Sequence, residues 1–425
     1  MAAETEMGII EDCRQLWRKL PLPTRIMIGK RIRFISEPLL AASIPTAGPY
    51  PRHSFQSVTI LGSFSSPIGH GVAAKLLDYE LRSRGIIVRR IDASEWIGAP
   101  IDAKLAIRSE EPAPDDVLIV ALNPDVAIHA LAKLGKEKLR NRKVIGYWVW
   151  ELEVVPRFWK LAGRFAHEIW TPSDFSAQAL KKLFDIPVHV VPHPVALLPP
   201  PAMTVERRAK GREALGVSDT AFVGIQSFSL ASSLTRKNAI GAISAFVAAF
   251  HDQPDARLIL RYLSGDRFPN SLQRLREAAK VAGPQVILRP AGEGLEDLHD
   301  LYAACDVYIS LHRTEGFGLN LAEVMMAGRP LIATKWSGNL DFMDVKCVAL
   351  VNADLVPLDD PDQVYSQKSG RWAEPRMDEA IRWLRTLAQS PDQRRQFAEA
   401  AREMAIAELS GNAVQTLQRP LRADS

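Results

Sequence analysis

The chain has 425 residues, of which 47% are hydrophobic and 24% charged, with three cysteines and a formal net charge of +4. These proportions are typical of a soluble globular protein and exclude a disordered chain, a collagen-like fibre and a disulfide scaffold. The length predicts two or three domains of roughly 100–200 residues. No run approaches the roughly 18 apolar residues of a membrane-spanning helix, and acidic residues interrupt any apolar signal-peptide core at the N-terminus. We expect a cytoplasmic protein, whose net charge is too small to indicate nucleic-acid binding.

Positive charge is concentrated near the N-terminus. Between Arg14 and Arg33 there are seven Lys or Arg and no Asp or Glu, and apolar side chains are interleaved with them. Such a segment can lie on an anionic membrane surface; a solvated arm packed on the first domain is the alternative. We expect residues 1–50 to form a basic amphipathic arm. Residues 14–34 are the part that would attach the protein peripherally to the inner face of a membrane.

From residue 57 onward, short apolar runs alternate with amphipathic stretches. The run 116–122 is apolar throughout, as in a strand covered on both faces, and Ser173 is a candidate helix N-cap. This βαβ pattern predicts a parallel sheet with helices on both faces. The predicted strands are 57–62, 86–91, 116–122, 143–149, 168–171 and 188–191, and the predicted helices are 71–84 and 173–183.

A proline-rich stretch at 192–201 predicts a linker, after which the pattern restarts. The fold class is therefore predicted as α/β, with two doubly wound parallel-sheet (Rossmann-like) domains and a cleft between them at the carboxyl ends of the strands. The expected domains are 51–200 and 201–390, followed by a helical tail, 391–425, that could cross back to the first domain. The second half has predicted strands at 221–226, 256–262, 285–288, 307–311 and 330–334, and helices at 238–250, 270–281, 295–304, 319–327 and 391–409.

A glycine-rich loop follows the predicted strand 307–311. Its residues 315–318 read EGFG, and a helix is predicted to begin near Leu319. Glycine lets the backbone approach a ligand closely, and free amides at a helix N-terminus suit an anion such as phosphate. Glu315 on the loop and Glu323 in the helix could both accept hydrogen bonds from the hydroxyls of one ligand. Alternatively, Glu323 only complements the helix dipole and Glu315 is solvated.

Residues 306–338 resemble the family-4 type (group 1) of retaining glycosyltransferases, which have the GT-B fold. The shared pattern is a pair of glutamates separated by seven residues, in the setting EGFGL…E…AG.P…AT..SG. The stretches GYWVWELE (146–153), SLTRKNAIGAISAFVAAF (233–250) and GRWAEP (370–375) resemble a bacterial polysaccharide-biosynthesis branch of that family. The resemblance extends over residues 57–410 and leaves the first 50 residues outside it. It implies an acceptor-side first domain and a nucleotide-sugar-binding second domain.

The resemblance also implies roles for matched residues. Glu323 would bind the ribose hydroxyls of a nucleotide sugar, and Glu315 would contact the donor sugar. Lys237 would contact the diphosphate, and Arg236 would supply a charge that the family usually places at the position of Ser232. Fixed cations and amides stabilise the negative charge of a departing nucleoside diphosphate; a solvated helix start is the alternative for both cations. The loop that holds the sugar and diphosphate would comprise Gly316, Phe317, Gly318, Leu319 and Asn320.

In the first domain, the resemblance implies that the loop with Gly69 and Gly71 borders the diphosphate and the acceptor. An ordinary strand–helix turn is the alternative. Many family members carry a histidine at the end of a first-domain strand, but the corresponding positions here include Asn123 and Glu151, so we assign no such histidine. Glu151 would position or polarise the acceptor hydroxyl. His193 lies between two prolines and is interpreted as a residue that sets the linker.

The implied function is transfer of a sugar from a nucleoside-diphosphate sugar to a glycan or lipid-linked acceptor, with retention of configuration, in polysaccharide or glycoconjugate biosynthesis. No metal or other cofactor is required. The Asp-x-Asp at 360–362 lies in a proline-containing loop and is interpreted as a turn. The nucleotide base, sugar, linkage and acceptor stay open. So do three alternatives: an epimerase or phosphorylase with this fold, a non-catalytic nucleotide-sugar-binding protein, and a membrane-attached assembly protein that uses the arm.

Overall fold

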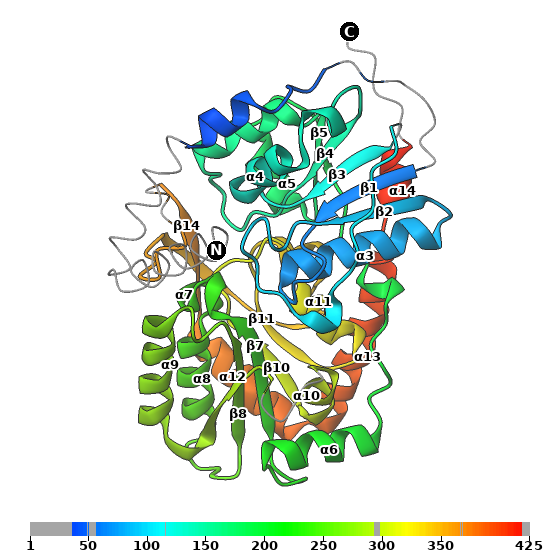
Figure 1. Cartoon of the computed structure of the whole chain (residues 1–425). Helices are drawn as coiled ribbons and strands as arrows, with labels where there is room; N and C mark the ends of the chain where they lie inside the picture. The colour runs from blue at the N-terminus through cyan, green and yellow to red at the C-terminus, as the bar shows by residue number, and fades with distance from the viewer. Residues whose placement is uncertain are drawn as a thin grey trace, which may run out of the picture.

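The computed structural model describes residues 36–48, 50, 57–114, 116–292, 298–365, 367 and 369–418. The expected membrane-contacting segment, 14–34, lies outside these residues. Figure 1 shows two α/β halves, the first coloured blue to teal and the second mainly green to orange. Each half contains a six-stranded sheet, which confirms the predicted two-sheet α/β architecture. No helix in the described part of the chain is both long and apolar enough to cross a membrane.

The first sheet has the strand order β2-β1-β3-β4-β5-β6, and each neighbouring pair is parallel. All six predicted strands are confirmed, and β3 is buried along its whole length, as its continuous apolar run predicts. Ser173 caps α5 as predicted, because its side chain accepts from the N–H of Ser176. The elements are β1 (Ser57–Gly62), α3 (Gly69–Ser83), β2 (Ile87–Asp92), β3 (Val117–Ala121), α4 (Pro124–Leu134), β4 (Val144–Tyr147), η3 (Arg157–Phe165), β5 (Glu168–Thr171), α5 (Asp174–Lys181) and β6 (Val188–Val190).

The second sheet has the order β12-β11-β10-β7-β8-β9. The five predicted strands are confirmed, whereas α6, α12, β12 and the antiparallel hairpin β13–β14 were not predicted. The elements are α6 (Val205–Leu215), β7 (Val223–Ser229), α7 (Leu234–Lys237), α8 (Ala239–Ala249), β8 (Arg257–Leu263), α9 (Pro269–Ala282), β9 (Val286–Pro290), α10 (Leu298–Ala304), β10 (Val307–Ser310), α11 (Leu319–Met326), β11 (Leu331–Thr334), β12 (Ala349–Val351), β13 (Ala353–Pro357), β14 (Arg371–Pro375) and α12 (Met377–Gln389).

The strand order places the switch points of the two sheets. In the first sheet the order reverses between β1 and β3, and in the second between β7 and β10. Ligands of doubly wound sheets bind beyond the carboxyl ends of the strands at such points. The loops after β1, β7 and β10 are therefore the places where the fold itself favours a ligand. Gly69 begins α3 after the first of these loops, Lys237 ends the short helix α7 that follows β7, and Glu315 lies in the loop after β10.

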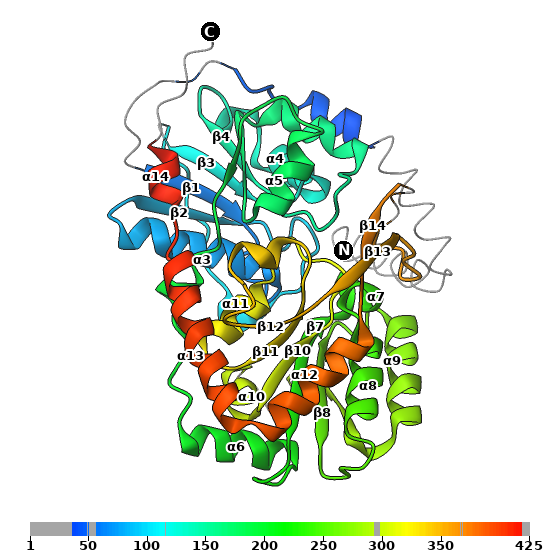
Figure 2. The same cartoon turned by 180° about the vertical axis from the view of Figure 1, so that it is seen from behind.

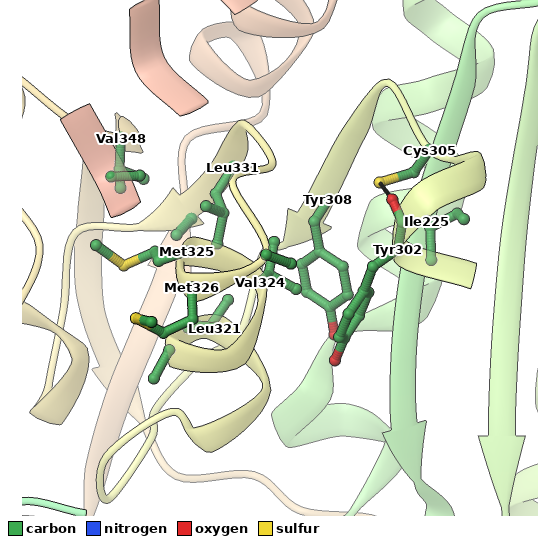
Figure 3. Close-up of a cluster of buried hydrophobic side chains, with 14 of the residues drawn as sticks. Ile225, Tyr302, Cys305, Tyr308, Leu321, Val324, Met325, Met326, Leu331 and Val348 are labelled. Atoms are coloured by element: carbon green, nitrogen blue, oxygen red, sulfur yellow. Dashed lines mark hydrogen bonds between the residues drawn. The ribbon is translucent and has the colours of Figure 1, made fainter. Parts of the chain in front are cut away.

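The core of the second half lies beneath α11. Figure 3 shows aliphatic and methionine side chains of α11 and neighbouring strands on one side, and Tyr302 and Tyr308 side by side on the other. The two tyrosine rings meet edge to face with their centroids 6.0 Å apart. Leu321, Val324 and Met325 are at most 2% exposed. Because one face of α11 is fixed in this core, the opposite face and the loop before it have a defined position.

The C-terminal helices connect the two halves. Figures 1 and 2 show α13 (Pro391–Glu408) running along the second half and α14 (Ala413–Leu417) lying near α3 of the first. Ser390 caps α13, because its side chain accepts from the N–H of Gln393. The N–H of Ala413 donates to Oε1 of Glu80 on α3 at 2.7 Å. The chain therefore returns to the first half and joins both halves at a point away from the linker.

Candidate active site

A cleft of about 2050 Å³ is lined by residues of both halves. Of the twelve residues predicted for the site, eleven line this cleft and Gly71 does not. A Cβ on Gly71 would come within 2.2 Å of the Ser66 carbonyl oxygen and 2.6 Å of that of Ser63. The structure thus gives Gly71 a packing role behind the cleft wall, because only a residue without a side chain fits between α3 and the loop before it. Gly69, the first residue of α3, does line the cleft.

The loop before α11 approaches the first half closely. Gly318 has a φ of 97° and is the N-cap of α11. A Cβ on Gly316 would come within 2.6 Å of Cγ1 of Val149 in the first half. Within the described part of the chain, no group accepts from the N–H of Phe317 or Gly318, and both residues line the cleft. Free amides at the start of a helix are suited to an anion.

Three charged side chains meet beside this loop. Nη1 of Arg236 donates to Oε2 of Glu315 at 3.0 Å, and Nζ of Lys237 donates to Oε1 of the same carboxylate. Burial alone would raise the pKa of Glu315, but the charges of Arg236 and Lys237 bring it well below its usual value. Burial and the charge of Arg236 lower the pKa of Lys237, while Glu315 opposes them. Two cations against one bonded carboxylate leave a surplus positive charge on the cleft wall.

Neither cation belongs to a solvated helix start. Arg236 is 3% exposed, and the Lys237 side chain is 19% exposed. Nη1 of Arg236 also donates to the Thr314 carbonyl oxygen at 2.8 Å, and its Nε donates to that of Ser232 at 3.0 Å. The guanidinium is therefore held against Thr314, the residue directly before the glycine-rich loop. Arg236 and Lys237 both line the cleft and both bond to Glu315.

A buried polar network fixes α7, which is only four residues long. Ser233 has a φ of 64°, and its hydroxyl accepts from the N–H of Arg236 at 3.0 Å and donates to Oδ1 of Asp360 at 2.7 Å. Oδ2 of Asp362 accepts from the N–H of Thr235 at 3.1 Å. The Asp-x-Asp segment lies in a turn, as predicted, but it also anchors α7. This second role cannot be recognised from the local sequence, because it depends on a contact between distant parts of the chain.

Glu323 lies on α11 and lines the same cleft. The Tyr302 hydroxyl donates to Oε2 of Glu323 at 3.3 Å. Burial raises the pKa of Glu323 to about 7, against the opposing effects of the Tyr302 hydrogen bond and the charge of Arg261. Arg261 comes from β8, donates to Oγ of Ser227 at 3.1 Å and also lines the cleft. Its only signal in the sequence is a charged residue inside an apolar strand, which is too weak to predict a site residue.

The part of the chain that carries this geometry matches a known family. Residues 227–367 match the family described as "Glycosyl transferases group 1". The matched segment contains both cations of α7, the glycine-rich loop and α11. No curated protein matches the sequence significantly.

Solved structures that align with 83–86% of this chain show that its fold is GT-B. HepE of Anabaena, in complex with UDP and glucose, aligns with 85% of this chain and 97% of its own, with a TM-score of 0.57 and 17% identity. A glycosyltransferase of Rickettsia africae aligns with 86% and 96%, with a TM-score of 0.56 and 15% identity. Sucrose-phosphate synthase of Thermosynechococcus elongatus aligns with 83% and 95%, with a TM-score of 0.56 and 14% identity.

Two groups of the first half face the matched segment, 227–367, across the cleft. The charge of Glu151 opposes the lowering of the Lys237 pKa, and the Glu151 carbonyl oxygen accepts from the Thr314 hydroxyl. His193 lies in the linker and also lines the cleft. Its ring packs edge-on against that of Phe317, with the ring centroids 4.8 Å apart. Nδ1 of His193 lies 2.7 Å from the Tyr147 hydroxyl oxygen. Burial and the charge of His70 lower the pKa of His193 to about 3, so the imidazole is neutral.

Proposed function

We propose that this protein transfers a sugar from a nucleoside-diphosphate sugar to an acceptor. The observation that carries the proposal is the placement of the Arg236–Lys237–Glu315 cluster beside the unpaired amides of Phe317 and Gly318. A diphosphate offers the negative charge for the cations and the acceptor oxygens for the amides. The family match over this same segment supports the proposal. HepE, which shares the fold, has been solved with UDP and glucose.

If the diphosphate lies beside this cluster, roles follow for the other residues of the site. The Glu323 carboxylate is a partly buried acceptor for the ribose hydroxyls, and Glu315 lies where the donor sugar would meet the loop. Gly316, Leu319 and Asn320 complete the wall around the sugar and diphosphate. In the reaction the bond between the sugar and the diphosphate breaks. The cations and amides then stabilise the charge that develops on the departing nucleoside diphosphate.

The first half supplies the acceptor side of the proposed reaction. Glu151 lines the cleft and would orient the acceptor hydroxyl, and Gly69 leaves open space at the start of α3. We propose retention of configuration, with the acceptor oxygen attacking from the face that the diphosphate leaves and its proton passing to the departing phosphate. The acceptor is proposed to be a glycan or a lipid-linked sugar, bound between residues 51–200 and the nucleotide-sugar-binding residues 201–390.

The resemblance to a bacterial branch of the family also motivates the proposed setting. This setting is polysaccharide or glycoconjugate biosynthesis in the cytoplasm, with residues 14–34 as a peripheral attachment to the membrane. A transferase that works without a metal needs other positive charge at the leaving diphosphate, and Arg236 and Lys237 supply it. Among the described residues, no group of three or more His, Cys, Asp or Glu side chains is placed to hold a metal ion.

The first test is a thermal-shift panel of UDP, GDP, ADP and dTDP on the purified protein and on Glu323→Ala. A nucleotide at 100 times its dissociation constant should add about 2.7 kcal/mol of apparent stability. A rise in melting temperature with one base only, lost in the variant, would support the nucleotide site and identify the donor. Sugar transfer from the matching donor would then separate an enzyme from a binding protein. No rise with any nucleotide, in a folded sample, would contradict the proposal.

Nucleotide affinity is expected to increase with pH because of Glu323. Hydrogen bonds from the ribose hydroxyls favour the ionised carboxylate, so binding should lower a pKa that is about 7 in the free protein and release a proton. The dissociation constant is therefore expected to fall by about threefold to tenfold between pH 6 and pH 8. Calorimetric titration of wild type and Glu323→Gln would measure it. Any pH dependence caused by the nucleotide's own phosphate remains in the variant, which serves as the baseline. An equal pH dependence of the dissociation constant in both proteins would show that Glu323 is not its cause.

A further inference from the structure

The carbonyl group of Gly316 is held by a serine from the other half of the molecule. Oγ of Ser173 donates to the Gly316 carbonyl oxygen at 2.5 Å, although the two residues are 143 positions apart. The same Oγ accepts from the N–H of Ser176 at 3.1 Å. Oγ of Ser176 lies 2.5 Å from the Trp150 carbonyl oxygen and 3.2 Å from that of Gly316. The Ser176 hydroxyl has one proton, which fits the shorter contact to Trp150, so Ser173 is the main donor to the Gly316 carbonyl.

Gly316 has little freedom to move on its other sides. The N–H of Glu315 donates to Oγ of Ser337 at 2.7 Å, and the N–H of Gly338 donates to the Glu315 carbonyl oxygen at 2.9 Å. A Cβ on Gly338 would come within 2.4 Å of the Gly316 carbonyl oxygen and 2.9 Å of Oγ of Ser173. Ser173 is completely buried. The peptide group between Gly316 and Phe317 is therefore packed against backbone on one side and capped by the Ser173 hydroxyl on another.

The direction of this carbonyl determines the direction of the next amide. A peptide group is planar and trans, so the N–H of Phe317 points opposite to the Gly316 C=O. With the carbonyl drawn toward Ser173, the N–H of Phe317 is turned away from α5. No group in the described ranges of the chain accepts from it. One hydroxyl of the first half thus orients a donor on a loop of the second half.

We propose that Ser173 is a positioning residue for the donor: by holding the Gly316 carbonyl, it aims the Phe317 N–H at the bound nucleotide sugar. This inference rests on the proposed function. It also links the two halves, since the loop has its working geometry only when α5 is docked against it. Ser173 need not touch the donor, because it acts through one peptide plane.

The test compares variants that separate the hydroxyl from the interface. Ser173→Gly removes the hydroxyl at little cost as a helix N-cap, and Ser173→Thr keeps it. Asp341→Ala is the matched control: Oδ2 of Asp341 accepts from the N–H of Asp174 at 2.6 Å, at the same end of α5, and it is not bonded to Gly316. Ser173→Ala replaces the glycine variant if that variant does not fold.

We expect Ser173→Gly to lower kcat by about tenfold to a hundredfold, the loss that a displaced positioning group typically causes. The donor KM should change less, and Ser173→Thr and Asp341→Ala should keep kcat within about threefold of wild type. The substrates are UDP-glucose, GDP-mannose, ADP-glucose and dTDP-glucose with a panel of sugar acceptors. A glycine variant with normal kcat would overturn the inference. So would an equal loss in Asp341→Ala, which would indicate a loosened interface.

Hydrogen–deuterium exchange of residues 315–321 in the ligand-free protein gives a second readout that does not depend on turnover. Exchange in this segment should be faster in Ser173→Gly than in wild type or Asp341→Ala. A wild-type protein that neither binds nor turns over any nucleotide sugar would refute the proposed function. The exchange rates would still decide whether Ser173 holds the loop. Equal rates in Ser173→Gly and wild type would show that it does not.

Discussion

Replacement of Lys237 by alanine is expected to lower the rate of sugar transfer by about two to three orders of magnitude. The protein should still fold, because the Lys237 side chain lines the cleft and Arg236 stays paired with Glu315. The cluster would then hold one cation against one carboxylate, and the surplus positive charge would be gone. Since the diphosphate is more negative in the transition state than in the bound donor, the loss should fall mainly on kcat.

Lys335→Ala is the matched control for this prediction. Lys335 is an exposed lysine that follows β11 in the same half, so its removal changes the net charge equally. We expect its kcat to stay within about twofold of wild type, since surface substitutions away from a site have small effects. Steady-state kinetics and melting curves of both variants are the measurements. Near-normal turnover in Lys237→Ala would show that the leaving diphosphate does not lie against α7.

The strands that carry the site could be predicted because they are continuous apolar runs between turn residues. Every predicted strand is present, since burial on both faces leaves no alternative for a run such as Val117–Ala121. The hairpin of β13 and β14 could not be predicted in the same way. Its burial is uneven, with Leu355 exposed and Trp372 buried, so it carries no continuous apolar signal. Local sequence patterns therefore identify the strands of the two main sheets better than the short hairpin outside them.

The residues of the site could be predicted where a motif joins chemistry to spacing, as for Glu315 and Glu323. What could not be predicted is contact across long stretches of chain. Ser173 is recognisable as an N-cap, but its bond to Gly316 depends on how the two halves dock. Asp362 is recognisable as a turn residue, but its bond to Thr235 depends on a loop that returns to α7. The position of His193 in the cleft likewise depends on how the two halves dock.

Substitution of Glu315 by glutamine is expected to destabilise the protein by about 3–5 kcal/mol, because it leaves the buried Arg236 and the partly buried Lys237 without their carboxylate. For a domain of this size the melting temperature should fall by roughly 6–20 °C. The same substitution at Glu374 is the matched control. Its carboxylate also accepts from an arginine, Arg313, at 2.6 Å, but its side chain is 43% exposed. That change should cost less than about 1 kcal/mol.

The destabilised Glu315→Gln protein also shows whether the Glu315 carboxylate only neutralises the two cations or itself holds the nucleotide. Without it the pKa of Lys237 should fall further, and a base with a depressed pKa in the folded state regains stability as the pH rises. The deficit should therefore shrink toward alkaline pH. UDP, or whichever nucleoside diphosphate binds, should also restore stability, because its phosphates replace the missing negative charge. The thermal shift should thus be larger in this variant than in wild type, and smaller in Lys237→Ala. A reduced shift in Glu315→Gln would mean that Glu315, rather than the surplus of cations, holds the nucleotide.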